Sequence, residues 1–145
     1  MSAAASTRNF AFFNATLWFL VAFMAMSSTA ALAGDWRLVA QQPDEVVFVD
    51  SSSIRDQGRL KTARVLRSFS SVQTIGDDAF PHKSEILDYA VRCEDRSIGF
   101  EAWTMTAGEI GTGETVWIGK LESPSLYRDP SDPVVASIID TTCNG

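Results

Sequence analysis

The sequence is poor in the residues that build metal and redox sites, with one histidine, His82, and two cysteines, Cys93 and Cys143, among 145 residues. A structural zinc site takes four such ligands, which this set cannot supply. A dithiol redox site usually has the spacing Cys-X-X-Cys, whereas these cysteines lie fifty positions apart. The sequence therefore predicts no metal site, no cofactor and no redox pair, and it leaves a structural disulfide as the role of the cysteines.

A long apolar run occurs only near the start of the chain, at residues 10–26. Small residues follow it and end at Ala33 in the Ala-x-Ala pattern that signal peptidase recognises. We expect residues 1–33 to be a signal peptide, and cleavage after Ala30 is the second choice. The alternative is that the apolar run is retained as a membrane anchor. Residues 34–145 would then form one domain, because a chain of this length supports a single core.

Export sets the compartment of this domain and the state of its cysteines. We expect a periplasmic protein of a Gram-negative bacterium, with the cell surface or the medium as the alternative. After cleavage of the signal peptide, no contact with the membrane is expected. In an oxidising compartment an even, small number of cysteines is most simply explained by a disulfide, here Cys93–Cys143.

Basic residues are also scarce: 12 lysines and arginines stand against 18 acidic residues, and the net charge is −6. A net negative chain does not gain affinity for nucleic acid by releasing counterions, so nucleic acid is excluded as a partner. The glycine-rich segment 108–114, GEIGTGE, lacks both the dinucleotide-binding spacing and the lysine of a phosphate loop. It is predicted to be a connection between strands.

The chain contains short runs of β-branched and aromatic residues, separated by turn residues, and this pattern predicts an antiparallel meander of about six strands. Together with one predicted helix, the meander indicates an α+β fold. Residues 51–59 are predicted to turn, with one helical turn around Ile54, and residues 71–84 to form a loop. The predicted strands are residues 35–40, 46–50, 60–71, 84–93, 98–105 and 115–121.

The end of the chain changes period and predicts a helix. Asp132 is placed to cap it and Pro133 to begin it. Val135, Ile138, Ile139 and Thr142 then recur at i, i+3, i+4 and i+7, the spacing of one helical face, and Cys143 continues this face. Cys93 shares the parity of the apolar residues in its strand, so the disulfide is predicted to attach the helix to the sheet.

Few residues suggest chemistry. His82 follows a proline in the predicted loop and is interpreted as exposed. The enzymatic alternative is a hydrolase that uses His82 as a general base. The neighbouring carboxylates, among them Asp44 and Glu45, fall in predicted turns and are interpreted as solvated. Trp103 and Met105 alternate with Phe100 along one strand, so they are predicted to lie on a second face of the sheet. We expect a binding site for a protein or apolar ligand there.

Together these segments resemble the surface-adhesin protein E family. The resemblance rests on VFVDSSSI, on Ser84, Tyr89, Cys93 and Arg96, on GTGE, and on a terminal helix that ends in cysteine. It implies a curved antiparallel sheet with a C-terminal helix held by a disulfide. From the residues alone we expect a non-enzymatic binding domain of the cell envelope whose partner is unknown. The alternative, which the resemblance implies, is an adhesin that binds host extracellular-matrix proteins. A meander leaves free edges, so a homodimer is a further expectation.

Overall fold

The computed structural model describes residues 33–77 and 79–145. The predicted signal peptide, apart from Ala33, lies outside the described residues, as does Asp78. Within the described part of the chain, no helix has the length and apolar character needed to cross a bilayer.

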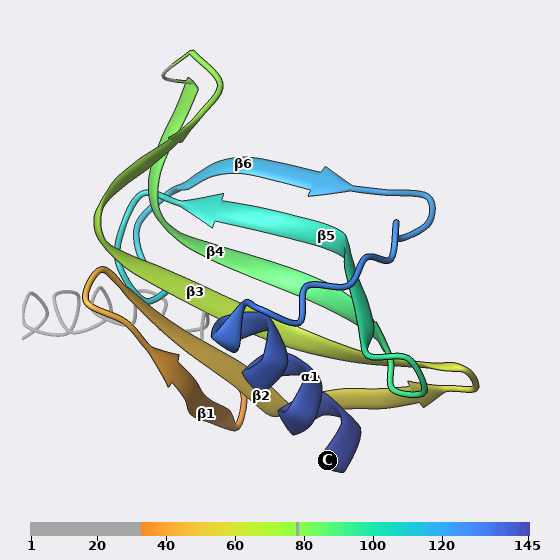
Figure 1. Cartoon of the computed structure of the whole chain (residues 1–145). Helices are drawn as coiled ribbons and strands as arrows, with labels where there is room; N and C mark the ends of the chain where they lie inside the picture. The colour runs from red at the N-terminus through yellow and green to blue at the C-terminus, as the bar shows by residue number, and fades with distance from the viewer. Residues whose placement is uncertain (1–32, 78) are drawn as a thin grey trace, which may run out of the picture.

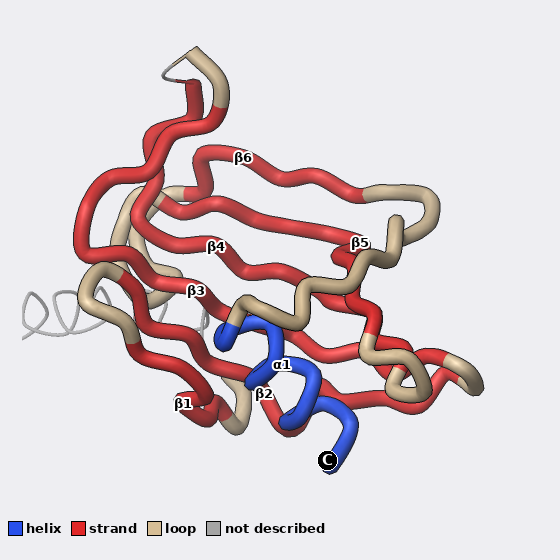
Figure 2. Tube along the Cα trace, viewed as in Figure 1, coloured by secondary structure: helices blue, strands red, loops and turns tan. Residues whose placement is uncertain are grey.

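Six antiparallel strands form one sheet in the order in which they occur along the chain, and one helix follows them (Figure 1). The predicted meander and terminal helix are confirmed. Most of the described part of the chain is strand, as Figure 2 shows, so the α+β class applies only loosely. The elements are β1 Trp36–Gln41, β2 Glu45–Gln57, β3 Leu60–Ile75, β4 Ala79–Arg92, β5 Ser97–Thr106, β6 Thr115–Lys120 and α1 Pro133–Asn144.

The predicted helical turn around Ile54 is wrong, because β2 continues through it. The pairing with β3 is interrupted between Asp50 and Arg55, and there the Arg64 amide of β3 donates a hydrogen bond to the Ser53 hydroxyl at 2.8 Å. The Asp50 carboxylate accepts hydrogen bonds from the Asp35 amide at 2.9 Å and from the Ser52 amide at 3.0 Å. The serine-rich VFVDSSSI motif therefore supports an irregular strand, since serine and aspartate side chains bond to nearby backbone groups.

The predicted loop at residues 71–84 is instead a continuation of β3 and β4. The two strands pair as far as Ile75 and Ala79, with irregularities on both sides of the Gln73–His82 pair. In Figure 1 this hairpin arm rises away from the rest of the sheet. Glycine and proline therefore mark the bend and tip of a long hairpin and not the end of its strands.

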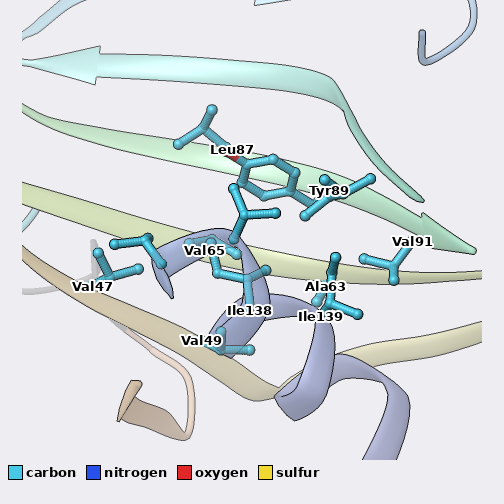
Figure 3. Close-up of a cluster of buried hydrophobic side chains, with 12 residues drawn as sticks. Val47, Val49, Ala63, Val65, Leu87, Tyr89, Val91, Ile138 and Ile139 are labelled. Atoms are coloured by element: carbon cyan, nitrogen blue, oxygen red, sulfur yellow. The ribbon is translucent and has the colours of Figure 1, made fainter. Parts of the chain in front are cut away.

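Helix α1 begins as predicted. The Asp132 carboxylate accepts hydrogen bonds from the amides of Val134 at 2.8 Å and Val135 at 3.3 Å. Its buried face packs against β1 to β4, and the core lies between the helix and these strands (Figure 3). The core side chains come from β2 to β5 and from α1: Val47, Val49, Ala63, Val65, Leu87, Tyr89, Val91, Ile98, Val134, Val135, Ile138 and Ile139.

A disulfide joins the end of α1 to the end of β4. Cys93 and Cys143 are bonded, with their Cα atoms 5.8 Å apart, which confirms the predicted pairing. The Lys61 ammonium donates a hydrogen bond to the Cys143 carbonyl at 3.2 Å, at the helix end where a positive charge is favourable. The Arg96 guanidinium donates a hydrogen bond to the Asp140 carboxylate at 2.6 Å, which links the β4–β5 turn to the same helix. These contacts hold the C-terminal half of the helix to the sheet.

The glycine-rich connection between β5 and β6 is held against the sheet by two buried serines. The Ser84 hydroxyl donates to the Gly108 carbonyl at 2.6 Å and accepts from the Gly111 amide at 2.8 Å. The Ser68 hydroxyl accepts from the Ile110 amide at 2.9 Å. These contacts give Ser84, part of the resemblance, a structural role.

Candidate functional site

The face of the sheet on which α1 lies, called here the helix face, is only partly covered. The helix packs against β1 to β4, while most of β5 and all of β6 extend beyond it (Figure 1). Cross-strand partners share a face, so the ladder Val49–Val65–Leu87–Trp103–Gly119 runs from beneath the helix to its uncovered part. The uncovered part of the helix face is therefore continuous with the core.

A β-bulge in β5 brings Trp103 to the helix face. Asp88 pairs with Ala102 whereas Tyr89 pairs with Phe100, so Glu101 is the extra residue. One extra residue reverses the alternation of side chains along the strand. The predicted second-face position of Trp103 and Met105 is therefore wrong, because Phe100 and Trp103 point to the same side.

Five aromatic side chains form a continuous row on this face, from the core to the start of β4. In order they are Tyr89, Phe100, Trp103, Trp117 and Phe80, and we call them the aromatic row. Their ring centroids are 6.4, 5.0, 4.5 and 6.1 Å apart in that order. Tyr89 is buried, the next three are half-buried, and Phe80 is exposed. Such spacings are those of interacting aromatic pairs.

Gly119 allows Trp117 to lie close to the backbone of its own strand. A Cβ atom added to Gly119 would overlap the Trp117 ring. Gly119 pairs with Trp103, so the Trp117 ring occupies the space that a side chain at position 119 would take. The two indoles are inclined by only 33°. Together they form a broad, half-exposed aromatic platform at the edge of the sheet.

Met105 does not share this exposure. It is 2% exposed, and it pairs with Glu85 on one side and Trp117 on the other. The predicted pair of contact residues therefore divides into one half-exposed side chain, Trp103, and one buried side chain, Met105. Sequence reasoning missed Trp117 and Phe80 as members of the row, although Trp117 also falls on a predicted strand.

A chain of charged side chains lies next to the aromatic row. Nε of Arg67 donates a hydrogen bond to the Glu45 carboxylate, and Nη1 of Arg67 lies 3.8 Å from Oε2 of Glu85. The other carboxylate oxygen of Glu85, Oε1, lies 3.1 Å from Nε2 of His82. The Glu45 side chain is only 10% exposed. The interpretation of Glu45 as a solvated turn residue is therefore wrong, since it is the partner of an arginine from a neighbouring strand.

His82 is also placed differently from the prediction. It is 1% exposed, within β4, and its Nδ1 lies 2.7 Å from the Phe80 carbonyl, which accepts the hydrogen bond. Its ring meets Phe69 edge-on at 6.3 Å. The predicted exposed loop histidine is thus a buried residue that holds the backbone of Phe80, the exposed end of the aromatic row.

Electrostatics favour this arrangement of charges. Burial opposes the charged form of Arg67, but the hydrogen bond and charge of Glu45 outweigh it and raise the pKa of Arg67. The same guanidinium lies 5.4 Å from the centroid of the Phe69 ring. Burial raises the pKa of the Tyr89 hydroxyl, so the inner end of the row is neutral at physiological pH. A fixed charge pair therefore borders an uncharged aromatic surface.

The buried polar side chains near the aromatic row already have hydrogen-bond partners among the described residues. The Ser84 hydroxyl bonds to Thr106, Gly108 and Gly111, and both ring nitrogens of His82 face other oxygens. No three His, Cys, Asp or Glu side chains gather as a metal ion would require between residues 33 and 145, Asp78 aside. The remaining feature of this region is a half-exposed aromatic surface bordered by paired charges.

Comparison with solved structures shows the same fold in protein E of Haemophilus influenzae. One crystal structure matches with a TM-score of 0.52 and covers 78% of this chain and 86% of that chain. A second crystal form matches with a TM-score of 0.54 and covers 78% and 90%. Sequence identity is 9% in both cases, so this likeness concerns the fold. No curated protein matches the sequence.

A match to a sequence-family model assigns the chain to a family, which the likeness of fold alone does not do. The family described as surface-adhesin protein E matches residues 36–144, which include every strand, the helix and the disulfide. The chain belongs to the surface-adhesin protein E family.

Proposed function

We propose that the protein is an exported, non-enzymatic binding domain of the bacterial cell envelope that acts as an adhesin, and that it binds its partner through the aromatic row. One observation carries the proposal: the platform of Trp103 and Trp117 is half-exposed on a part of the helix face that α1 leaves uncovered. Membership of a family of surface adhesins supports the same reading.

The physical argument rests on what such a surface gains when it is covered. Tryptophan and tyrosine are enriched among the side chains that dominate binding energy, because each removes a large apolar area from water with few rotatable bonds. Arg67, Glu45 and Glu85 are already paired, so they form a polar border that need not be rearranged on binding. The row is therefore suited to a protein or apolar ligand.

Removal of the platform should abolish most of the binding. Each of Trp103→Ala and Trp117→Ala should weaken binding to immobilised extracellular-matrix proteins at physiological salt by about thirtyfold, the loss expected of a central aromatic anchor. Surface plasmon resonance measures the change. Leu38→Ala is the matched control, because Leu38 is an exposed apolar residue whose partner Phe48 lies outside the core ladder. Unchanged binding of both tryptophan variants would refute the proposal.

Location provides a second test. We expect protease added to intact cells to digest the domain, because an adhesin must reach its partner at the cell surface. Protection until the outer membrane is permeabilised would instead place the domain in the periplasm, as expected from the sequence alone, and would remove the adhesin role. The intact mass of the recovered protein should correspond to a chain that starts at Gly34 and has lost two hydrogens at Cys93 and Cys143.

A further inference from the structure

The last strand, β6, is an open edge of the sheet. Among the described strands it pairs only with β5, and Ile118 at its centre is 70% exposed. The first strand, β1, is the other edge, but a register shift between Leu38 and Ala40 interrupts its pairing. A bulge of this kind protects an edge from pairing with another chain. The pairing of β6 also shifts once, but near its start, between Met105 and Thr106 of β5, and it is regular from Trp117 to Lys120. The β6 edge therefore keeps a regular stretch next to its bulge, whereas the bulge of β1 lies in the middle of that strand.

The direction of the β6 backbone groups follows from one hydrogen bond. The Leu121 amide donates to the Glu101 carbonyl of β5 at 2.7 Å. Hydrogen-bonded and non-bonded pairs alternate along an antiparallel ladder, so Gly119 and Trp117 also turn their amides and carbonyls toward β5. The amides and carbonyls of Ile118 and Lys120 then point away from the sheet.

Along its regular stretch, from Trp117 to Lys120, this edge carries one charged residue and no proline, so few of the devices that keep edge strands from pairing are present there. Residues 116–119 carry no charge and no proline. Lys120 stands at the end of the strand and forms no ion pair with another described residue. Regularly spaced donors and acceptors of this kind are satisfied by another extended backbone, which is the mode of recognition called β-augmentation.

We propose that the β6 edge receives an extended segment of the partner protein as a seventh strand, so that the partner's side chains alternate between the aromatic platform and Ile118. This inference deepens the proposed function and rests on it. Trp117 faces one side of β6 and Ile118 the other, so the segment is apolar on both sides at these positions. An acidic residue opposite Lys120 would supply the missing charge.

The probe is a phage-displayed library of random peptides, about twice the length of β6, selected on the protein purified after export. Enriched peptides should be rich in β-branched and aromatic residues. Each should bind Ile118→Pro at least about tenfold more weakly than the unchanged protein, because proline removes the outward amide of Ile118 and one bond to the added strand. An edge strand tolerates proline where its amide faces outward.

Two controls separate the backbone from the side chain and from folding. Ile118→Thr removes the apolar side chain but keeps the amide, and it should retain more binding than Ile118→Pro. In the unchanged protein, hydrogen exchange of the Ile118 and Lys120 amides should slow when a selected peptide binds, whereas exchange at Gly119 should change little. This measurement needs no variant and therefore does not depend on the folding of Ile118→Pro.

The outcomes distinguish this inference from the proposed function. Peptides that lose binding to Trp103→Ala but bind Ile118→Pro normally, with unchanged exchange at Ile118 and Lys120, would overturn the edge and leave the aromatic row. Failure to enrich any peptide would also overturn it. A dimer of the unchanged protein that Ile118→Pro converts to monomer would assign the edge to a second copy of the chain.

Discussion

Replacing both Cys93 and Cys143 with alanine should lower the free energy of unfolding by about 4 kcal/mol and the melting temperature by about 15 °C. The bond closes a loop of fifty residues. In the chain-entropy model its removal raises the conformational entropy of the unfolded chain and so stabilises the unfolded state of the variant. Because a small domain has only about 5–15 kcal/mol of stability in total, this change is a large share.

Chemical denaturation and calorimetry measure the effect. Reduction of the unchanged protein with dithiothreitol should reproduce it, and dithiothreitol should have no effect on the double alanine variant. Equal stability of the oxidised protein and the double variant would show that hydrophobic packing of Ile138 and Ile139 alone is enough to hold α1 on the sheet.

Arg67→Met should lower the free energy of unfolding by about 3 kcal/mol, because it leaves two poorly solvated carboxylates without their partner. Glu45 and Glu85 have side chains only 10% and 17% exposed, and both face Arg67. The expected loss is smaller than for a fully buried pair, since Arg67 itself is 31% exposed. Urea denaturation monitored by tryptophan fluorescence measures the change.

The matched control removes the charges together with the arginine. In R67M/E45Q/E85Q no carboxylate remains unpaired, so much of the lost stability should return. Recovery would identify the unpaired carboxylates as the cause. If the triple variant were as unstable as Arg67→Met, the loss would instead arise from the packing of the Arg67 stem, including its contact with Phe69.

Elements whose signals are local could be predicted from the sequence. Asp132, Pro133 and the apolar spacing after them specify where α1 begins and which face it buries, because capping and helical period depend on neighbouring residues only. Strand alternation likewise predicted β4 and the side of the sheet on which Cys93 lies. The pairing of Cys93 with Cys143 followed from their number and from the expected export, and these two elements indicated that the bond attaches the helix to the sheet.

Features that depend on contacts between strands could not be predicted. Arg67 interrupts an apolar pattern, and its partners Glu45 and Glu85 come from the strands on either side of it. His82 is buried by Phe69 and held by Glu85, which no spacing around a proline reveals. The aromatic row was missed for the same reason, since its order depends on the register of β4, β5 and β6.

The extra residue at Glu101 has an evolutionary consequence. Substitutions in β5 change which side chain the sheet displays, but only a gain or loss of one residue changes the side on which all later side chains appear. Two proteins can keep this fold at 9% identity while a single insertion or deletion moves the tryptophans of one of them to the opposite surface. Within such a family, the length of β5 is therefore a better guide to the face on which its later side chains appear than the identity of any residue in it.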